Sequence, residues 1–323
     1  MTPPNPPYET EVRRYGEAAI AEAAALILAG LPVAVPTETV YGLAADATSG
    51  EAVARIYAAK GRPSFNPLIV HVASRAQAET IAVWDDLSRS LADRFWPGPL
   101  TLVLPLRGDS RIAGIATAGL DTIALRMPAH RAMQHLLAAA GRPLAAPSAN
   151  ASGRISPTRA EHVLASLAGR IPLVIDDGAT AHGVESTIIA TRDGEARLLR
   201  PGPLSAEALG IRPETTCSTR IEAPGQLQSH YAPRKPLRLD AIAAHAGEWL
   251  IGFGDVAGDA TLSRSGDLVE AAARLFEAMH QAERAAPAAI AVAPIPPEGL
   301  GAAINDRLRR AAAPGRTQEE LRR

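Results

Sequence analysis

Short apolar segments of strand length alternate with segments of helix length along the first two thirds of the chain. The strand-like segments are residues 31–35, 68–72, 100–106, 122–125, 144–146, 173–175 and 187–190. Helix-like segments separate them, and the clearest are residues 17–29, 50–59, 131–140 and 158–168. This alternation is typical of a sheet covered by helices, whereas Thr187 and Leu198 lie in strand-like segments with no helix between them, which predicts an antiparallel pair. We therefore expect an α/β fold with a mixed sheet.

The alternation stops in a segment rich in proline and polar residues, which we interpret as a linker over residues 212–236. Beyond it, strand-like segments recur at residues 237–239, 249–253 and 289–292, and helix-like segments at residues 267–284 and 301–310. The predicted organisation is a first domain over residues 1–211, this linker, and a small α/β domain over residues 237–323.

Charge and cysteine content exclude several classes of protein. The 323 residues carry 33 Lys and Arg against 34 Asp and Glu, so no overall positive field attracts the chain to nucleic acid or to a membrane. Cys217 is the only cysteine, which excludes an intramolecular disulfide framework and a multi-cysteine metal cluster. We find neither a signal peptide nor an apolar run of about 18 residues, so we expect a cytosolic protein without a membrane partner.

The common nucleotide and metal signatures are missing. Neither lysine of the chain, Lys60 or Lys235, follows a glycine, so there is no P-loop. Gly252, Gly254 and Gly258 only approximate a dinucleotide fingerprint and are more typical of a turn. The eight histidines include no HExxH pattern. We therefore expect no protein-bound catalytic metal.

Polar clusters instead follow the predicted strands, where open α/β sheets bind their ligands. These clusters are residues 36–43, 60–71, 121–126, 146–156, 183–187 and 199–203. Taken singly, each is as typical of a turn or a helix cap as of a site. Lys60 and Arg62 could clamp a phosphate or simply end a helix. Arg126 closes a buried strand and requires a counter-anion, for which a structural carboxylate or a substrate carboxylate would serve equally.

The order of these clusters resembles a known family. The motifs PTETVYGL, KxR, NPLIVHV, WPGPLT, LRMP, APSAN, GVEST and LRPGP follow one another as in the YrdC-like domain of threonylcarbamoyl-AMP synthases, over about residues 17–209. The linker and the segment after it are similar to the long, two-domain form of that family. The resemblance implies a twisted open mixed α/β sheet joined to a smaller Rossmann-like α/β domain.

The resemblance also implies an activity. The family condenses L-threonine, bicarbonate or CO2, and ATP into threonylcarbamoyl-AMP and pyrophosphate, and tRNA threonylcarbamoyl transferase machinery consumes the product. Magnesium would arrive with ATP. Such chemistry depends on positioning and charge neutralisation rather than on a covalent nucleophile, which suits the residue types found. The alternative is a noncatalytic RNA-binding module, against which the net charge of -1 and the low aromatic content (4 Phe, 3 Trp and 5 Tyr) weigh.

Site residues are implied by the same resemblance. L-Threonine would contact Thr39, His71, Arg126, Ala146 and Ser186. ATP would contact Arg62, Asn66, Thr122, Ser148, Asn150, Ser156 and Arg200. Lys60 and Arg62 would act as the catalytic cations that stabilise the departing pyrophosphate. On its own, His71 in an apolar strand is more often a core histidine whose hydrogen bonds are satisfied.

Two expectations concern the rest of the molecule. The long form often carries a lysine and a tyrosine in its linker where this chain has Leu227 and Gln228, so His230 and Tyr231 become the candidates for linker contacts with the nucleotide. We also expect the linker and the second domain to form a lid that limits access of water to a labile acyl adenylate. The synthase interpretation requires the predicted site residues to converge on one pocket.

Overall fold

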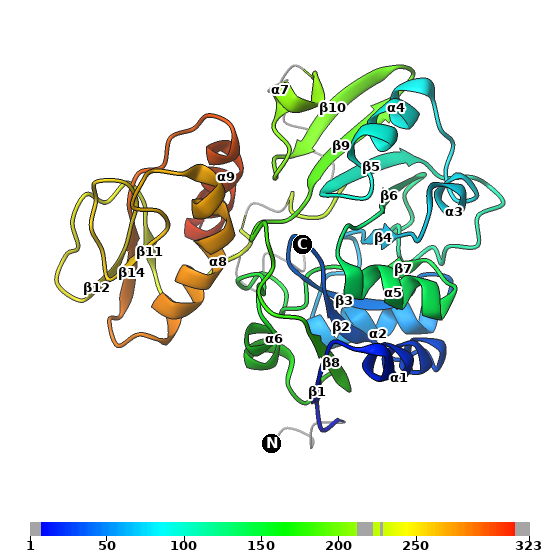
Figure 1. The fold of residues 1–323 in the computed structure, drawn as a ribbon, viewed down its shortest axis with the longest axis horizontal. Helices are drawn as coiled ribbons and strands as arrows, with labels where there is room; N and C mark the ends of the chain where they lie inside the picture. The colour runs from blue at the N-terminus through cyan, green and yellow to red at the C-terminus, as the bar shows by residue number, and fades with distance from the viewer. Residues whose placement is uncertain (1–7, 212–221, 227–228, 314–323) are drawn as a thin grey trace.

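A computed structural model describes residues 8–211, 222–226 and 229–313. Within these residues the chain forms a large domain with a ten-stranded sheet and a smaller domain with a four-stranded sheet (Figure 1). The predicted α/β fold with a large mixed sheet and a second, smaller domain is confirmed. Leu227, Gln228 and Cys217 lie outside the described residues, as do residues 1–7 and 314–323.

The large sheet has the strand order β1-β8-β2-β3-β7-β4-β6-β5-β9-β10. Its strands are β1 (Glu11–Arg14), β2 (Val33–Pro36), β3 (Tyr41–Asp46), β4 (Ile69–His71), β5 (Leu100–Pro105), β6 (Thr122–Arg126), β7 (Leu144–Ala145), β8 (Leu173–Asp176), β9 (Thr187–Arg192) and β10 (Glu195–Arg200). Four strand pairs are parallel, such as β4 with β6, and five are antiparallel, such as β2 with β3. The predicted antiparallel pair is β9 with β10, in which Leu198 lies opposite Ile189.

Helices cover both faces of the large sheet. They are α1 (Glu17–Leu28), α2 (Gly50–Lys60), α3 (Arg75–Glu79), α4 (Asp86–Phe95), α5 (Arg131–Ala140), α6 (Ala160–Leu167) and α7 (Ala206–Leu209). Val33 and Val35 of β2 pack with α1 and α5, while Ala34 between them belongs to the core on the side of α2. Because successive strand residues face opposite sides, one short apolar strand contributes to two cores.

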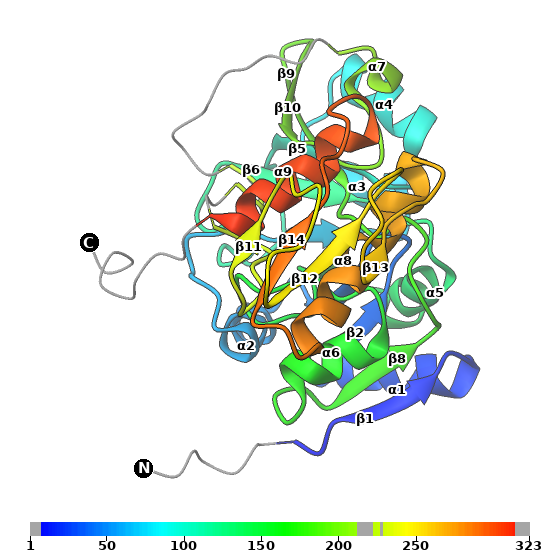
Figure 2. The same cartoon turned by 90° about the vertical axis from the view of Figure 1, so that its left-hand side faces the viewer.

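The smaller domain is a parallel sheet with two helices. Its strands are β11 (Leu237–Arg238), β12 (Glu248–Gly252), β13 (Ala260–Thr261) and β14 (Ala289–Val292), in the order β11-β14-β12-β13, and its helices are α8 (Leu268–Arg284) and α9 (Leu300–Ala312). Figure 1 places α8 and α9 between this sheet and the large domain, and Figure 2 shows the same domain from its sheet side.

The two domains share a hydrophobic core. Val40, Ile155 and Val184 of the large domain belong to the same buried cluster as Leu275 and Phe276 of α8. Burial of apolar surface between domains is the main force that keeps them docked. The second domain therefore packs directly against loops at the edge of the large sheet.

Some elements were not expected from the sequence. Residues 36–43 were interpreted as a polar cluster after a strand, but Tyr41 already begins β3, which pairs back onto β2 with Tyr41 opposite Pro36. β1, β13 and the helices α3, α4 and α7 were also missed. The helix predicted from residue 158 begins at Ala160 instead.

Candidate functional site

The tight turn between β2 and β3 forms one wall of a cavity. The Thr37 hydroxyl donates to the carbonyl of Val40 at 2.7 Å, and it accepts from the backbone N–H of Thr39 at 3.2 Å. The Thr39 hydroxyl lies 2.8 Å from that of Thr37 and 3.0 Å from Nη1 of Arg126. Since Arg126 can only donate and the Thr37 proton is used on Val40, the Thr39 hydroxyl accepts from Arg126 and donates to Thr37. The turn thus fixes the direction of a chain of hydrogen bonds.

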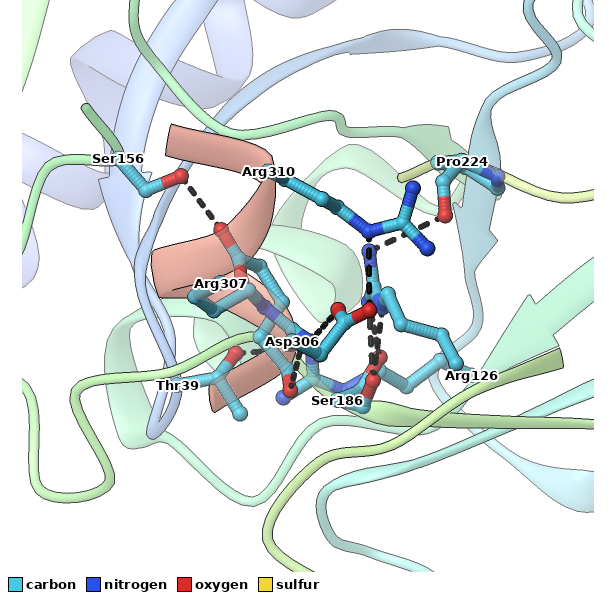
Figure 3. Close-up of polar contacts among 10 residues, drawn as sticks. Thr39, Arg126, Ser156, Ser186, Pro224, Asp306, Arg307 and Arg310 are labelled. Atoms are coloured by element: carbon cyan, nitrogen blue, oxygen red, sulfur yellow. Dashed lines mark hydrogen bonds and ion pairs between the residues drawn. The ribbon is translucent and has the colours of Figure 1, made fainter. Parts of the chain in front are cut away.

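Arg126 ends β6 and has all three guanidinium nitrogens engaged. Nε donates to the carbonyl of Gly98 at 3.3 Å, and Nη2 forms an ion pair with Oε1 of Glu38 at 2.7 Å. Nη1 donates to Thr39 (Figure 3). Burial raises the pKa of the Glu38 carboxyl, but the charge of Arg126 and the hydrogen bonds to the carboxylate together outweigh burial and lower the pKa below its ordinary value. The required counter-anion is therefore present in the protein as an ionised glutamate, which sequence reasoning left out of the site.

His71 lies beside Arg126 because β4 and β6 are parallel and pair these two residues in register. Burial, reinforced by the charge of Arg126, lowers the pKa of His71 to about 3, so the ring is neutral at physiological pH. Neither ring nitrogen has a hydrogen-bond partner, although both are buried. Buried polar atoms without partners are rare in proteins. His71 is therefore not a core histidine with satisfied hydrogen bonds, and its nitrogens are available to a ligand.

Arg62 enters the same cavity after the end of α2. Gly61 closes the helix with φ of 59°, a left-handed conformation that glycine adopts readily, and the chain turns there. Arg62 donates from Nε to the carbonyl of Asn66 at 3.2 Å and from Nη2 to the carbonyl of Pro67 at 2.8 Å. Burial lowers the pKa of Arg62 to about 10, which leaves the guanidinium charged at neutral pH.

Lys60 lies behind the loop that carries Ser148. Its Nζ donates to the carbonyls of Ser148 and Asn150, each at 2.5 Å. The Asn150 amide in turn donates to the carbonyl of Arg154 at 2.8 Å. Burial, with the nearby charge of Arg62, lowers the pKa of Lys60 well below its usual range. In this arrangement Lys60 and Asn150 shape the loop, and neither lines the cavity.

Arg200, the last residue of β10, also lines the cavity. Its Nε and Nη2 donate to the carbonyl of Ser186 at 3.1 and 2.9 Å, and Nη2 also donates to the Ser186 hydroxyl at 3.1 Å. Nη1 reaches the carbonyl of Pro224 in the linker at 3.4 Å. The Ser186 hydroxyl lies 2.8 Å from that of Thr101 on β5. These contacts fix an arginine and a serine on the same wall.

The predicted residues converge as the synthase interpretation requires. One narrow cavity is lined by Thr39, Arg62, His71, Arg126, Ala146, Ser148, Ser186 and Arg200, which come from six separate stretches of the chain. Ser156 lies one contact behind it, because its hydroxyl donates to the lining residue Glu185 at 2.5 Å. Asn66 is also behind the wall, with its carbonyl engaged by Arg62 and its buried side-chain amide unpartnered.

Thr122 is the predicted residue that the structure does not bring to this cavity. It begins β6, whereas Arg126 ends the same strand, so the two lie about 13 Å apart along it. Thr122 lines a separate, open hollow beside β9 and β10. The resemblance placed Arg126 at threonine and Thr122 at ATP in one shared pocket, but the extended strand carries the two residues to opposite edges of the sheet.

The linker and the second domain contribute residues to the site as well. His230 and Tyr231, the two linker candidates, line the cavity together with Pro224 and Gly225. Tyr231 is 1% exposed, and its hydroxyl has no partner. The sequence missed Glu185 as a lining residue, and it missed Arg307 of α9, which contacts Glu185 through the domain interface. Because Glu185 and Arg307 are 122 positions apart in the sequence, no local motif predicts their contact.

The charges of the cavity favour anions. Three arginines line it, and the one lining carboxylate, Glu185, is held by Arg307 at 2.8 Å. Among the described residues, one trio of metal-ligand type occurs, Glu161 with His162 and Glu277, and none of the three lines the cavity. The arrangement can therefore bind carboxylate and phosphate groups, exclude water and neutralise charge without a nucleophilic triad. No helix among the described residues has both the length and the apolar character needed to cross a bilayer.

Family models match nearly all of the described chain. The model described as "Telomere recombination" (Sua5, YciO and YrdC) matches residues 25–202, and the model described as "Threonylcarbamoyl-AMP synthase, C-terminal domain" matches residues 204–313. The first match alone covers more than half of the chain.

Curated relatives and solved structures agree with these matches. A threonylcarbamoyl-AMP synthase of Pyrococcus abyssi is 41% identical over 317 residues, which cover 90% of this chain and 93% of the relative. A threonylcarbamoyl-AMP synthase of Bacillus subtilis is 47% identical over 68% of this chain, and the alignment spans 66% of that relative's length. The crystal structure of P. abyssi Sua5 complexed with L-threonine superposes with a TM-score of 0.84 at 38% identity, covering 94% of this chain and 96% of that one.

Proposed function

The chain belongs to the threonylcarbamoyl-AMP synthase family in its two-domain form, and we propose that its cavity condenses L-threonine, bicarbonate or CO2, and ATP. The products are threonylcarbamoyl-AMP and pyrophosphate, and one water is released in addition when bicarbonate is the carbon source. The enzyme is thereby a nucleotidyltransferase, and a tRNA threonylcarbamoyl transferase is the expected consumer of its product in the cytosol. The observation that carries this proposal is the convergence of Arg62, Arg126 and Arg200 on one cavity with small hydroxyl side chains between them.

The threonine would lie at the Arg126 end of the cavity. Its carboxylate suits the Arg126 guanidinium, and it would share that cation with Glu38. Neutral His71, with two unpartnered nitrogens, would hydrogen-bond the amino-acid head group. The remaining expected contacts, Thr39, Ala146 and Ser186, line the same cavity. In support, a solved relative of similar fold holds L-threonine.

ATP would lie between the two other arginines. Arg62 and Arg200 line the cavity and would hold phosphate oxygens, and Ser148 lines it as well. Asn66, Asn150 and Ser156 would support this part of the site from behind. Thr122 is not part of this proposal, because it lies outside the cavity.

The reaction needs positioning more than it needs reactive side chains. A threonine amine captures CO2 as a carbamate, and a carbamate oxygen attacks the α-phosphorus of ATP in line while pyrophosphate leaves. Arg62 would stabilise the charge of the leaving pyrophosphate. Lys60 would contribute through the Ser148 loop, to which its ammonium is bound. Magnesium would come with ATP and be held mainly by phosphates and water, since Glu38 and Glu185 already pair with arginines.

The linker and the second domain would act as the lid of this site. His230 and Tyr231 lie in the cavity wall and their chain continues into the second domain. A closed wall would keep water from the mixed anhydride of threonylcarbamoyl-AMP. Domain opening would then be required for substrate entry and product release.

Mass spectrometry of the reaction products tests the function directly. With ATP, L-threonine and bicarbonate, we expect threonylcarbamoyl-AMP and pyrophosphate in equal amounts, and no acyl adenylate when bicarbonate is removed. Equimolar L-serine should compete poorly if the cavity recognises the threonine methyl group. Salt-sensitive binding of bare tRNA without consumption of ATP would instead favour the noncatalytic RNA-binding alternative.

A further inference from the structure

A buried ion pair joins the second domain to the wall of the cavity. Glu185 precedes β9 in the large domain, and Arg307 lies in the middle of α9. Nε of Arg307 donates to Oε2 of Glu185 at 2.8 Å, and Nη2 donates to the Glu185 carbonyl at 3.4 Å. Arg307 is 0% exposed and Glu185 is 6% exposed. The two residues are separated by 122 positions, so only docking of the domains brings them together.

The neighbours of Glu185 are the groups expected to hold ATP. Its other oxygen, Oε1, accepts from the Ser156 hydroxyl at 2.5 Å, and its backbone leads directly into Ser186, which Arg200 binds (Figure 3). Glu185 lines the cavity and Arg307 does not. Arg307 therefore reaches a ligand in the cavity through the lining residues that it contacts, which are Glu185 and Tyr231, whose ring centroid lies 5.3 Å from the guanidinium carbon.

An unpaired carboxylate at this place would oppose the binding of a polyphosphate. ATP carries about four negative charges, and like charges repel strongly where water is excluded. Buried ion pairs are often no more stabilising than apolar residues of the same size, so stability alone is a poor explanation for this one. The ion pair instead explains how the Glu185 carboxylate can lie beside an anion site, because the positive charge of Arg307 neutralises it.

Held in this way, Glu185 also fixes the role of Ser156. The Ser156 hydroxyl donates its proton to Glu185 and keeps only acceptor capacity. Such an oxygen can accept from a hydroxyl or amino group of a nucleoside, but it cannot donate to a phosphate.

We propose that Arg307 is a positioning residue through which the docked second domain sets the affinity of the cavity for ATP. It neutralises Glu185 and holds its side chain against Ser156, so the anion site is complete only when α9 is in place. This inference rests on the proposed use of the cavity for ATP. In addition to its proposed role as a lid, the second domain would contribute the positive charge of Arg307 to nucleotide binding.

The test measures binding of α,β-methylene-ATP by calorimetry, and the KM values for ATP and threonine, on full-length variants. Arg307→Gln should weaken binding of the analogue about tenfold and raise the KM for ATP more than that for threonine, since a like charge faces the phosphates. The double variant Glu185→Gln with Arg307→Gln should bind within about threefold of the wild type.

A matched control separates this role from domain docking in general. Arg159 and Glu277 form another ion pair across the same interface, with Nε and Oε2 at 3.0 Å, and neither lines the cavity. Arg159→Gln should leave binding of the analogue within about twofold of the wild type. If Arg307→Gln behaved like this control, or if the double variant bound as weakly as the single one, the inference would be wrong.

The test can still contradict the proposal if Arg307→Gln does not fold, and it separates the role of Arg307 from the proposed function. Should Arg307→Gln fail to fold, Glu185→Gln alone must bind the analogue at least as tightly as the wild type, and weaker binding overturns the proposal. Binding of the analogue does not require turnover. A wild type that binds it but forms no threonylcarbamoyl-AMP would contradict the proposed function while leaving the effect of Arg307 measurable.

Discussion

Two buried acid–arginine pairs each contribute one residue to the lining of the cavity. Glu38 pairs with Arg126 at 2.7 Å, and Glu185 pairs with Arg307 at 2.8 Å. In the first pair the arginine faces the cavity, while in the second the carboxylate does. In the first pair, Arg126 can therefore bind a substrate carboxylate. In the second pair, Arg307 neutralises the carboxylate of Glu185, which would otherwise repel a phosphate.

Replacement of Arg126 by lysine tests the first pair. Lysine keeps the charge but loses the planar fork that contacts Gly98, Thr39 and Glu38 together. We expect Arg126→Lys to raise the KM for threonine by about 10- to 100-fold, the value of a charged hydrogen bond, with a much smaller change in the KM for ATP. Steady-state kinetics at saturating co-substrate measures both.

The control for this change is Arg131→Lys. Arg131 is an exposed arginine that pairs with Asp177 through two hydrogen bonds, at 2.7 and 2.5 Å, outside the cavity. Its kinetics should match those of the wild type. Equal effects of the two substitutions would remove Arg126 from the threonine site.

Lys60 offers a second prediction, because its ammonium holds the Ser148 loop instead of facing the cavity. Lys60→Ala should lower kcat about 100-fold in a pyrophosphate-release assay, as expected when preorganised groups around a leaving phosphate are lost. Lys235 at the end of the linker is a matched control, with Nζ donating to the carbonyls of Ala282 and Ala285 of the second domain at 2.8 and 2.5 Å. Wild-type kcat in Lys60→Ala would show that neither the loop nor its lysine supports catalysis.

Short motifs made most of the cavity predictable, and contacts across long separations did not. Arg62, Ser148 and Arg200 each follow a strand or helix in a recognisable motif, and all three line the cavity. Glu38 was visible in its motif, but only the register of the turn pairs it with Arg126. Arg307 had no local signal at all, because its partner lies in the other domain.

Among the helices, α6 and α8 meet through two stacked histidines. The rings of His162 and His280 lie 3.8 Å apart between centroids at 17°. His280 also contacts the carbonyl of Ser156 at 3.1 Å, while His162 lies 3.3 Å from a carboxylate oxygen of Glu277. The charged groups around the pair are Glu277 with Arg159, Glu283 and Arg284. Two neutral rings stack well, whereas two protonated rings would repel each other at this distance.

This stack predicts loss of stability in mild acid. Burial, with the nearby His280 and arginine charges, lowers the pKa of His162 to about 2 in the folded chain, from about 6.5 when unfolded. The unfolded chain binds more protons between these values, so the unfolding free energy falls as the pH drops below about 6.5, by up to about 1.4 kcal/mol per pH unit for this histidine. Urea unfolding at pH 7, 6 and 5 measures the slope.

A variant separates His162 from the other titrating groups. His162→Phe keeps a ring on His280 but cannot be protonated, so its stability should depend on pH less steeply, by about 1.4 kcal/mol per unit. His71 retains its own lowered pKa of about 3 and accounts for part of the slope that remains. An unchanged slope in His162→Phe would exclude the stack as the acid-sensitive element.

Strands with an obvious apolar pattern were predicted well, and short or unusual ones were missed for physical reasons. β3 carries the sequence YGLAAD, which is buried on both faces and lacks the alternation that marks a half-buried strand. β1 is exposed along its whole length and is held by parallel pairing with β8. The core strand β5, by contrast, is a continuous apolar run and was found at residues 100–106.

The two domains approach each other closely where Gly183 meets α8. A Cβ atom built on Gly183 would lie 2.4 Å from the carbonyl oxygen of Ala272 and 2.5 Å from Cα of Ala273, and the residue has a φ of +67°. The same segment continues through Val184, in the shared core, to Glu185. Glycine at this position thus permits the contact that brings α9 and its arginine to the cavity.

Gly183→Ala is therefore expected to push the second domain away from the cavity without changing a group in the site. Strain and overpacking of this kind cost about 1–3 kcal/mol, so the thermal midpoint should fall. The KM for ATP should rise as the Glu185–Arg307 contact loosens, and product hydrolysis by water should become faster. Gly178→Ala is the matched control, since Gly178 has a φ of +80° but nothing within 4 Å of the added carbon. Gly178→Ala introduces the same kind of backbone strain as Gly183→Ala but no steric clash. If the two variants showed kinetic defects of equal size, close packing of Gly183 against α8 would not be required to complete the site.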